Sequence, residues 1–386
     1  MFCRQLKIDL PNAQSAFLWG PRKTGKSTFL KATFPDSIYI DFLKTDVYFE
    51  ILKRPSLLRE QILARESESL RHPIILDEVQ KIPEVLDEVH WMIENEHLSF
   101  ILCGSSVRKL KRGRANMLGG RAWRFQMHPL TYSEIPDFDL LKALNRGLIP
   151  SHYGSDHYGR SIKSYIQDYL KEEIQAEGLV RNLPSFARFL DAVGFTNGEL
   201  VNFTNIARET GVDSKTVKEY FNILEDTLLG HFIEPWSKST GRDSLTKVPK
   251  FYLFDCGIAN YLSHTSIDIE KGKEFGHAFE QFIFLELLAY LSYNEIDTKM
   301  RYWRTKTGLE VDFILGDVDL AIEVKSSSRV DGSELKGLYA FIEEAQPRRA
   351  IVVCNEKEKR KTGMIEFYPW REFLKDLGGH KFQIKG

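Results

Sequence analysis

The sequence has few cysteines, no excess of charge and no long apolar run, and each absence narrows its range of functions. Four cysteines among 386 residues are scattered without CxxC spacing, which excludes the familiar zinc patterns and favours a reducing compartment. The first residues, MFCRQLKIDLPNAQ, lack the apolar segment of a signal peptide. The longest apolar run, at 282–291, is short and contains Glu286. We therefore expect a cytoplasmic protein without a membrane span.

Composition and length indicate a folded protein of several domains. A hydrophobic content of 42% with 28% charged residues is typical of globular chains and argues against disorder. Lysine and arginine (53) nearly balance aspartate and glutamate (54), so a surface for nucleic acid would have to be a local patch. At about 100–200 residues per domain, the length predicts two to three domains.

The segment GPRKTGKS at 20–27 has the spacing of a phosphate-binding loop, between an apolar stretch and a helix-like stretch. In such loops backbone N–H groups curl around phosphate oxygens, while Lys26 would reach the terminal phosphates and Ser27 would offer its hydroxyl to Mg²⁺. The alternative is a turn with a chance Gly-Lys-Ser sequence. The expected nucleotide-binding residues are Gly20, Pro21, Arg22, Lys23, Thr24, Gly25, Lys26, Ser27 and Thr28.

Two acids follow the apolar strand expected at 74–76, and parallel sheets bind ligands at such carboxyl ends. Asp77 is expected to hold Mg²⁺, in part through water, and Glu78 to orient or deprotonate the water that attacks the γ-phosphate. Two adjacent acids favour hydrolysis of ATP over storage. Without the phosphate-binding loop, the same pair would equally suit a helix N-cap with its first-turn acid.

A further apolar strand ends in CGSS, where Ser105 is expected to sense the γ-phosphate. A stretch of basic residues without an acid follows, which suits contact with nucleic acid or phosphate as well as a solvated loop. We expect Arg121 to assist phosphoryl transfer. A homo-oligomer is favoured in which Arg121, or another arginine in its loop, acts on a neighbour's nucleotide, although a monomeric function stays open. The basic residues are Arg108, Lys109, Lys111, Arg112, Arg114, Arg121 and Arg124.

The pieces GPRKTGKST, IILDEVQKIP, CGSS, and GGR followed by HPLTYSEI resemble the AAA-type ATPases found as bacterial and archaeal fusion proteins. This resemblance implies an α/β multidomain protein. A P-loop domain with a parallel sheet would be followed by a winged-helix segment and a C-terminal region similar to the restriction-endonuclease fold.

The middle of the chain has the proportions of a helix-turn-helix, with a short helix at 205–210, a turn through Gly211 and a second helix capped by Asp213 or Ser214. Groove-reading side chains project from the start of such a second helix, although many of these units serve only for packing. A loop rich in Ser, Lys and Arg then looks like a wing, and Asp255 after the next strand is a structural candidate. The candidate contacts to DNA are Ser214, Lys215, Thr216 and Lys218.

Three charged residues interrupt apolar strands in the last third of the chain. Glu323 and Lys325 point to the same face of one strand, and Asp312 on the preceding strand reaches them if the two strands form a hairpin around 316–317. Two carboxylates and a lysine form an oxygen-rich site for Mg²⁺ or Mn²⁺. With Glu280 on the preceding helix, the set resembles the PD-(D/E)xK nuclease core, which implies that all four residues are catalytic and that Asp312 and Glu323 hold the metal.

The expected domains are an ATPase at 1–150, a helical linker at 151–192, a winged helix at 193–268 and a nuclease-like domain at 269–386. The expected cofactors are ATP and Mg²⁺ or Mn²⁺, and the expected partner is nucleic acid, DNA more than RNA. Alternatives stay open: Glu323 and Lys325 would also suit an edge-strand charge pair, and the fold would also suit a non-cleaving, ATP-dependent switch that binds DNA or a protein. A small-molecule kinase lacks an evident acceptor site.

Overall fold

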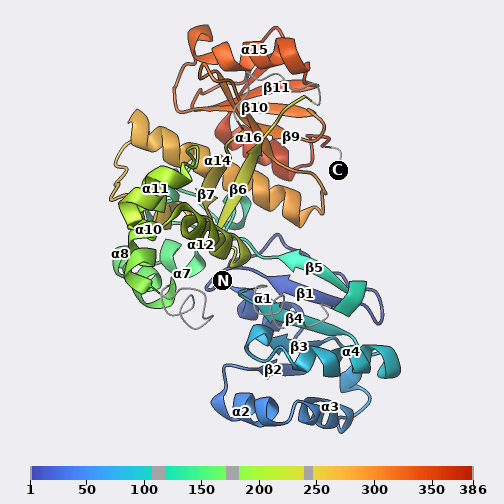
Figure 1. The fold of residues 1–386 in the computed structure, drawn as a ribbon. Coiled ribbons are helices and arrows are strands. Elements are labelled where there is room, and N and C mark those ends of the chain that lie inside the picture. The colour runs from blue at the N-terminus through green and yellow to red at the C-terminus, as the bar shows by residue number, and fades with distance from the viewer. Residues whose placement is uncertain (1, 107–117, 171–181, 239–246, 385–386) are drawn as a thin grey trace. The chain divides into compact units, whose positions relative to one another are not determined.

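The computed structural model describes residues 2–106, 118–170, 182–238 and 247–384, and Figure 1 shows the fold. The chain divides into two compact units. The N-terminal unit comprises residues 4–129 and 226–229, and the C-terminal unit comprises residues 1–3, 130–225 and 230–386.

The N-terminal unit is built on a sheet of five strands in the order β2-β3-β4-β1-β5, and every neighbouring pair is parallel. Its strands are β1 (Ser15–Trp19), β2 (Tyr39–Asp41), β3 (Ile74–Asp77), β4 (Phe100–Gly104) and β5 (Ala122–Gln126). The helices are α1 (Lys26–Thr33), α2 (Thr45–Lys53), α3 (Ser56–Leu63) and α4 (Val85–Glu96). The fully buried strands β1, β3 and β4 are nearly continuous apolar runs, as covered parallel strands require. Their carboxyl ends share one edge of the sheet.

Helices dominate the first half of the C-terminal unit. They are α6 (Leu140–Arg146), α7 (Pro150–Tyr153), α8 (Tyr158–Ser164), the π-helix η5 (Tyr165–Leu170), α10 (Leu183–Phe195), α11 (Phe203–Thr210), α12 (Ser214–Asp226) and α13 (Cys256–Leu262). Residues 171–181 of the helical linker expected at 151–192 lie outside the described residues.

The turn between α11 and α12 has the local chemistry that the sequence predicts. Gly211 ends α11 with a φ of 70°, which favours glycine. Asp213 then caps α12, because its Oδ1 accepts hydrogen bonds from the backbone N–H groups of Lys215 and Thr216, both at 2.9 Å. The hairpin of β6 (Gly230–Pro235) and β7 (Lys250–Leu253) follows.

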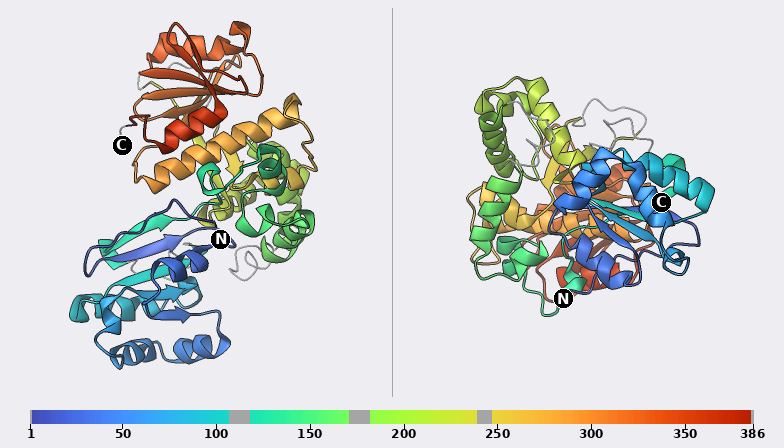
Figure 2. Two further views of the ribbon diagram at one scale, coloured as in Figure 1. Left: turned by 180° about the vertical axis from the view of Figure 1, so that it is seen from behind. Right: turned by 90° about the horizontal axis from the view of Figure 1, so that it is seen from below.

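The second sheet has eight strands in the order β12-β13-β11-β10-β9-β8-β6-β7. The remaining strands are β8 (Arg301–Arg304), β9 (Glu310–Leu315), β10 (Leu320–Lys325), β11 (Arg349–Cys354), β12 (Arg360–Thr362) and β13 (Ile365–Pro369), and the helices are α14 (Gly272–Tyr293), α15 (Lys336–Ala345) and α16 (Trp370–Gly378). Figures 1 and 2 show α15 on the face of this sheet opposite to α14 and α16. The two apolar cores of this unit are consistent with that arrangement. Ile322 packs in one core with α14 and α16, and Ala321 packs in the other with α15.

The β6–β7 hairpin extends this sheet, because β6 pairs in parallel with β8 through Glu234 and Arg301. The sheet therefore runs across residue 268, where the sequence suggests a domain boundary. The 22-residue helix α14 carries buried polar groups such as Gln281 and Glu286 among its apolar residues. In the part of the chain that the structure describes, no helix is both long enough and apolar enough to cross a membrane.

Candidate functional site

The predicted phosphate-binding loop joins β1 to α1 and has backbone conformations that such a loop requires. Gly25 precedes α1 with a φ of 96°, and Lys23 has a φ of 60°, both in the left-handed region. At Gly20 a Cβ atom would lie 2.4 Å from the carbonyl oxygen of Met127, so only glycine fits. The ammonium of Lys26 lies across the loop, donating hydrogen bonds to the carbonyl oxygens of Gly20 (2.7 Å) and Pro21 (2.9 Å).

Two further contacts hold the loop in place. The hydroxyl of Thr24 donates to the carbonyl oxygen of Pro21 at 2.7 Å, inside the loop. The guanidinium of Arg4 donates to the carbonyl oxygens of Thr24 (3.0 Å) and His128 (2.5 Å), which ties the loop to the end of the sheet. Arg4 was not among the predicted phosphate-site residues, because no motif links position 4 to position 24.

The two groups expected to bind Mg²⁺ lie side by side. The Ser27 hydroxyl donates to Asp77 Oδ2 at 2.6 Å, and the Tyr39 hydroxyl donates to the same oxygen. Burial and this hydrogen bond raise the pKa of Tyr39, so the phenol stays protonated and remains a donor. The hydroxyl and the carboxylate are oxygen ligands of the kind that Mg²⁺ prefers.

Glu78 directly follows β3 with a φ of 60° and a ψ of 41°, a backbone conformation that is uncommon outside glycine and that concentrates at functional sites. Burial raises the pKa of its carboxyl group, and Arg22 and Lys26 counteract that shift through their charges. The side-chain amide of Gln80 donates to Glu78 Oε2 (2.5 Å) and to the Ser105 hydroxyl (3.0 Å). The structure thus links the expected water-activating acid to the expected γ-phosphate sensor through Gln80, which the sequence analysis missed although it stands within the DEVQ motif.

Arg121 lies at the other edge of this sheet. In the parallel pairing of β1 and β5, Ser15 is opposite Ala122 and Trp19 is opposite Gln126. Arg121 therefore sits beside the start of β1, roughly 15 Å along the strand from the phosphate-binding loop. Its side chain pairs with Glu94 of α4. The structure therefore does not bring Arg121 to the predicted phosphate-binding loop of its own unit. The basic residues Arg108, Lys109, Lys111, Arg112 and Arg114 lie outside the described residues, and Arg124 is exposed.

The acidic residues of the second half come together on β9 and β10. The strands pair antiparallel, with Leu315 opposite Leu320 and Phe313 opposite Ile322, so the same register brings Asp312 opposite Glu323. Asp312 Oδ2 accepts a hydrogen bond from the Val324 N–H at 2.7 Å.

The Lys325 ammonium donates to Glu323 Oε1 at 2.5 Å. Both carboxylates, Asp312 and Glu323, are buried, with exposed fractions of 7% and 5%. The predicted hairpin therefore exists, and it gathers the three residues.

The electrostatics of these carboxylates suit a cation. Burial raises the pKa of Asp312 well above its usual range, and the nearby charges of Glu323 and Glu280 add to this shift. Burial likewise raises the pKa of Glu323 to about 7, against the opposing effect of Lys325. Glu323 Oε2 is buried and has no hydrogen-bond partner among the described residues, so one carboxylate oxygen is left for a cation.

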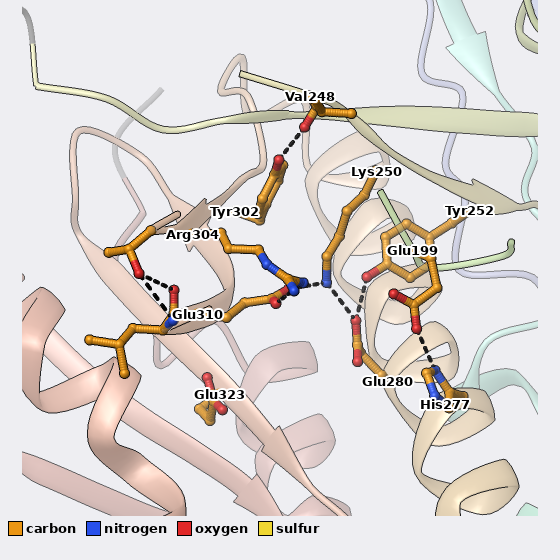
Figure 3. Close-up of polar contacts among 12 residues, drawn as sticks. Glu199, Val248, Lys250, Tyr252, His277, Glu280, Tyr302, Arg304, Glu310 and Glu323 are labelled. Atoms are coloured by element: carbon orange, nitrogen blue, oxygen red, sulfur yellow. Dashed lines mark hydrogen bonds and ion pairs between the residues drawn. The ribbon is translucent and has the colours of Figure 1, made fainter. Parts of the chain in front are cut away.

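Glu280 of α14 is held by residues from the β6–β7 hairpin (Figure 3). It accepts hydrogen bonds from the Tyr252 hydroxyl at 2.5 Å and from the Lys250 ammonium at 3.2 Å. Lys250 also forms an ion pair with Glu310, which is bonded to Arg304 at 2.6 Å. In the described parts of the chain, no three His, Cys, Asp or Glu side chains are grouped closely enough to hold a metal ion. The sequence analysis missed Lys250, Tyr252 and Glu310; only Glu310, two residues before Asp312, left a signal, as a further charge on the same strand.

Asp255 has a structural role in the C-terminal unit. Its carboxylate caps α13 by accepting from the Ile258 N–H (3.0 Å), and it accepts from the Leu148 N–H at 2.6 Å. Burial raises the pKa of this carboxyl group to about 6, and the backbone donors oppose the shift.

Three protein-family models match successive segments of the chain. Residues 12–136 match an AAA domain. Residues 137–268 match a family described as "Domain of unknown function (DUF8612)", and residues 275–373 match "Domain of unknown function (DUF4143)".

The chain is also similar to bacterial proteins along most of its length. It is 23% identical over 342 residues to an uncharacterised protein of Mycobacterium tuberculosis, Rv2008c, in an alignment that covers 86% of this chain and 72% of that protein. An uncharacterised protein of Haemophilus influenzae is 20% identical over 352 residues, covering 79% of this chain and 80% of its own length.

Among solved structures, the Orc1 protein of Aeropyrum pernix in complex with DNA aligns with 66% of this chain and 87% of its own, at 14% identity and a TM-score of 0.24. That score is too low to support an argument about fold or ligand. The AAA family match, in contrast, covers the segment in which Lys26, Ser27, Asp77 and Glu78 are brought together. The first third of the chain therefore contains a P-loop ATPase domain of the AAA type.

Proposed function

We propose that the N-terminal unit binds ATP with Mg²⁺ and hydrolyses it. The observation that carries this proposal is the cluster at the carboxyl ends of β1, β3 and β4, where Ser27 bonds Asp77 and Gln80 bonds Glu78. The ion, held by Ser27 and Asp77, would neutralise charge on the phosphates. Lys26 would bind the β- and γ-phosphates, and Glu78 would accept a proton from the attacking water.

Two substitutions separate binding from chemistry. Lys26→Ala is expected to abolish ATP binding, because it removes the cation aimed at the phosphates. Glu78→Gln is expected to retain ATP binding and to lower kcat by about 100-fold or more, as loss of a general base does. Phosphate release without an added acceptor, together with fluorescent-nucleotide titration, measures both effects. Hydrolysis by Glu78→Gln at the wild-type rate would refute the role of Glu78, and absence of phosphate release by the wild type would favour a kinase.

We also propose that the C-terminal unit holds one Mg²⁺ or Mn²⁺ ion between Asp312 and Glu323 and cleaves nucleic acid. The free, buried Oε2 of Glu323 beside a second carboxylate supports this reading. The ion would lower the pKa of a bound water and neutralise the scissile phosphate. Lys325 would stand beside that water and stabilise developing negative charge, a role that its ion pair with Glu323 supports.

We propose, as part of the nuclease function, that the middle of the chain binds DNA. The helices α11 and α12 followed by the β6–β7 hairpin have the element order of a winged helix. Ser214, Lys215 and Lys218 at the start of α12 are exposed, as residues that read a groove must be. Phosphate contacts by these lysines would make binding fall as the salt concentration rises.

A cleavage assay tests the nuclease proposal. Plasmid DNA, single-stranded DNA and RNA are incubated with the full chain, ATP and Mg²⁺ or Mn²⁺, and the assay is repeated with Lys325→Ala. The matched control is Lys361→Ala, which removes an exposed lysine from β12 of the same sheet. We expect metal-dependent cutting by the wild type and the control, and at least a 100-fold loss in Lys325→Ala, about the contribution of a positioned catalytic group. Equal cutting by all three proteins would remove the assignment.

One observation favours the non-cleaving switch as a second candidate. The carboxylates of Glu280 and Glu310 are already neutralised by Lys250 and Arg304, so part of the acidic cluster is satisfied by the protein itself. If this reading holds, the wild type cuts no substrate, whereas its affinity for DNA or a protein changes between ATP and ADP. Titration of labelled DNA with each nucleotide distinguishes the two candidates.

A further inference from the structure

The ammonium of Lys250 is buried among carboxylates that come from two other elements of the C-terminal unit, α14 and β9. Only 3% of this residue is exposed. Its Nζ lies 3.2 Å from Glu280 Oε1 and also pairs with Glu310, as Figure 3 shows. Burial alone would lower the pKa of Lys250, but the charges of Glu280, Tyr252, Glu310 and Asp312 outweigh that effect and raise it. Lys250 is therefore a permanent cation inside the acidic cluster.

The partners of Lys250 have further donors of their own. Glu280 also accepts a hydrogen bond from the Tyr252 hydroxyl at 2.5 Å. Glu310 also accepts a hydrogen bond from the Arg304 guanidinium at 2.6 Å. Glu323 differs, because its Oε2 is buried without a hydrogen-bond partner in the described chain. The cluster is thus divided into carboxylates that the protein neutralises and a carboxylate oxygen that remains free to take a cation.

We propose that Lys250 is the built-in counter-cation of the acidic site, which keeps Glu280 and Glu310 from a divalent ion and leaves Asp312 and Glu323 as its carboxylate ligands. The inference rests on the proposed metal site and adds its regulation. Lys250 is a positioning residue, since it acts through Glu280 and Glu310.

Lys250 and its two carboxylate partners belong to different elements, so a movement of one element would separate them. Lys250 begins β7, the return strand of the hairpin that follows α12, whereas Glu280 belongs to α14 and Glu310 to β9. A shift of β7 would withdraw the ammonium and release Glu280 toward the ion. This links the segment at 193–268 to the acidic site by a single charge.

Calorimetric titration of the nucleotide-free, 386-residue chain with Mn²⁺ tests the proposal without relying on cleavage. Asp312→Asn is expected to weaken binding by about tenfold or more, because it removes a ligand of the ion. Glu280→Gln keeps the shape and the acceptor for Lys250, and is expected to change the affinity by less than about twofold. If Glu280→Gln weakens Mn²⁺ binding as much as Asp312→Asn does, Glu280 is a ligand and the proposal is wrong.

Lys250→Met provides the converse test, since methionine retains the length of the side chain without its charge. We expect it to bind Mn²⁺ about tenfold more tightly than the wild type, and we expect Glu280→Gln in the same chain to cancel that gain. An unchanged affinity in a folded Lys250→Met protein would overturn the proposal. If the circular dichroism spectrum shows that Lys250→Met does not fold, the comparison of Glu280→Gln with Asp312→Asn decides alone, because both proteins keep Lys250.

The outcomes also separate this inference from the proposed nuclease function. If Mn²⁺ binding is insensitive to Glu280→Gln and cutting is unaffected by Lys325→Ala, the nuclease proposal is wrong and the proposed role of Lys250 stands. Binding by Lys250→Met but not by the wild type also supports the lysine's role while it removes metal-dependent cleavage by the resting protein. Absence of Mn²⁺ binding in both proteins overturns the two proposals together.

Discussion

At the scale of single residues, the candidate nucleotide site depends on side chains that each bond two partners. Asp77 accepts hydrogen bonds from Ser27 and Tyr39, and Gln80 donates to Glu78 and Ser105. A side chain with two partners has fewer rotamers available, so the reactive group that it contacts is held in place. Glu78 needs such support, because its carboxyl group is buried and its backbone is in the left-handed region.

Gln80→Leu is expected to lower kcat for ATP hydrolysis by about tenfold and to leave ATP affinity within about twofold. Leucine has a similar volume and lacks the amide, so Glu78 loses the donor that orients it, while no predicted phosphate ligand is removed. Steady-state phosphate release gives kcat, and fluorescent-nucleotide titration gives the affinity. An unchanged kcat would show that Glu78 does not depend on Gln80, and a lost affinity would show that the substitution damages the loop itself.

The sequence predicted some residues of the two candidate sites and missed others, and the difference has a physical reason. Gly20 and Lys26 belong to a motif whose spacing follows from one loop wrapping one phosphate chain, so the sequence carries the whole constraint. Arg4 and Lys250 act through partners 20 and 30 residues away. Such pairs arise only when the chain folds, and a single arginine or lysine in a sequence resembles any solvated charge.

At the scale of elements, α14 shows how a core helix carries polar groups when each has a partner. Glu280 bonds Lys250 and Tyr252 on one part of the helix. Glu286, two turns further along, is buried and accepts the Tyr132 N–H at 2.7 Å. Burial raises the pKa of Glu286 to about 8, although this hydrogen bond opposes the shift.

Glu286→Gln is expected to make the C-terminal unit more stable at neutral and alkaline pH. An unfolded glutamate titrates near about 4.3, so between that pH and about 8 the folded protein keeps a proton that the unfolded chain releases. The contribution of Glu286 to the free energy of unfolding is therefore greatest at acidic pH and falls as pH rises, by at most about 1.4 kcal/mol per pH unit. Glutamine stays neutral and keeps the acceptor for Tyr132.

Urea unfolding at pH of about 5, 6.5 and 8 measures this effect. The stability gain of Glu286→Gln over the wild type should grow across the series, and Glu274→Gln, which changes an exposed acid in the first turn of the same helix, should show no such trend. A gain that is constant with pH would mean that Glu286 is ionised in the folded protein.

Elements differed in how well the sequence predicted them. The β9–β10 hairpin follows from the alternation of Asp312, Glu323 and Lys325 with apolar residues and from the left-handed turn at Gly316, with a φ of 67°. The parallel pairing of β6 with β8 joins strands more than 60 residues apart in the sequence, at Glu234 and Arg301. No local pattern encodes a parallel partner, and so the extension of the sheet across residue 268 became evident only in the structure.

At the scale of the whole molecule, the two candidate sites belong to different units. The nucleotide site is formed by residues of the N-terminal unit, and the acidic site is formed entirely within residues 250–325 of the C-terminal unit. Each candidate site is thus formed by residues of one unit, except for one predicted component, the arginine expected to assist hydrolysis. Because Arg121 lies at the edge of the sheet opposite to the phosphate-binding loop, a second copy would have to supply it.

This geometry predicts complementation between two inactive variants. Arg121→Ala should bind ATP normally and hydrolyse it at least about 1,000-fold more slowly, the usual contribution of such an arginine, whereas Lys26→Ala should fail to bind ATP. In mixed assemblies, the intact Arg121 of one variant should face the intact loop of the other. Mixing them should therefore restore part of the phosphate release, and the specific activity of the wild type should rise with protein concentration.

Arg124→Ala, which changes an exposed arginine three residues away, is the matched control and should hydrolyse ATP like the wild type. Full activity of Arg121→Ala alone would exclude this role, and the case for assembly through Arg121 would end with it.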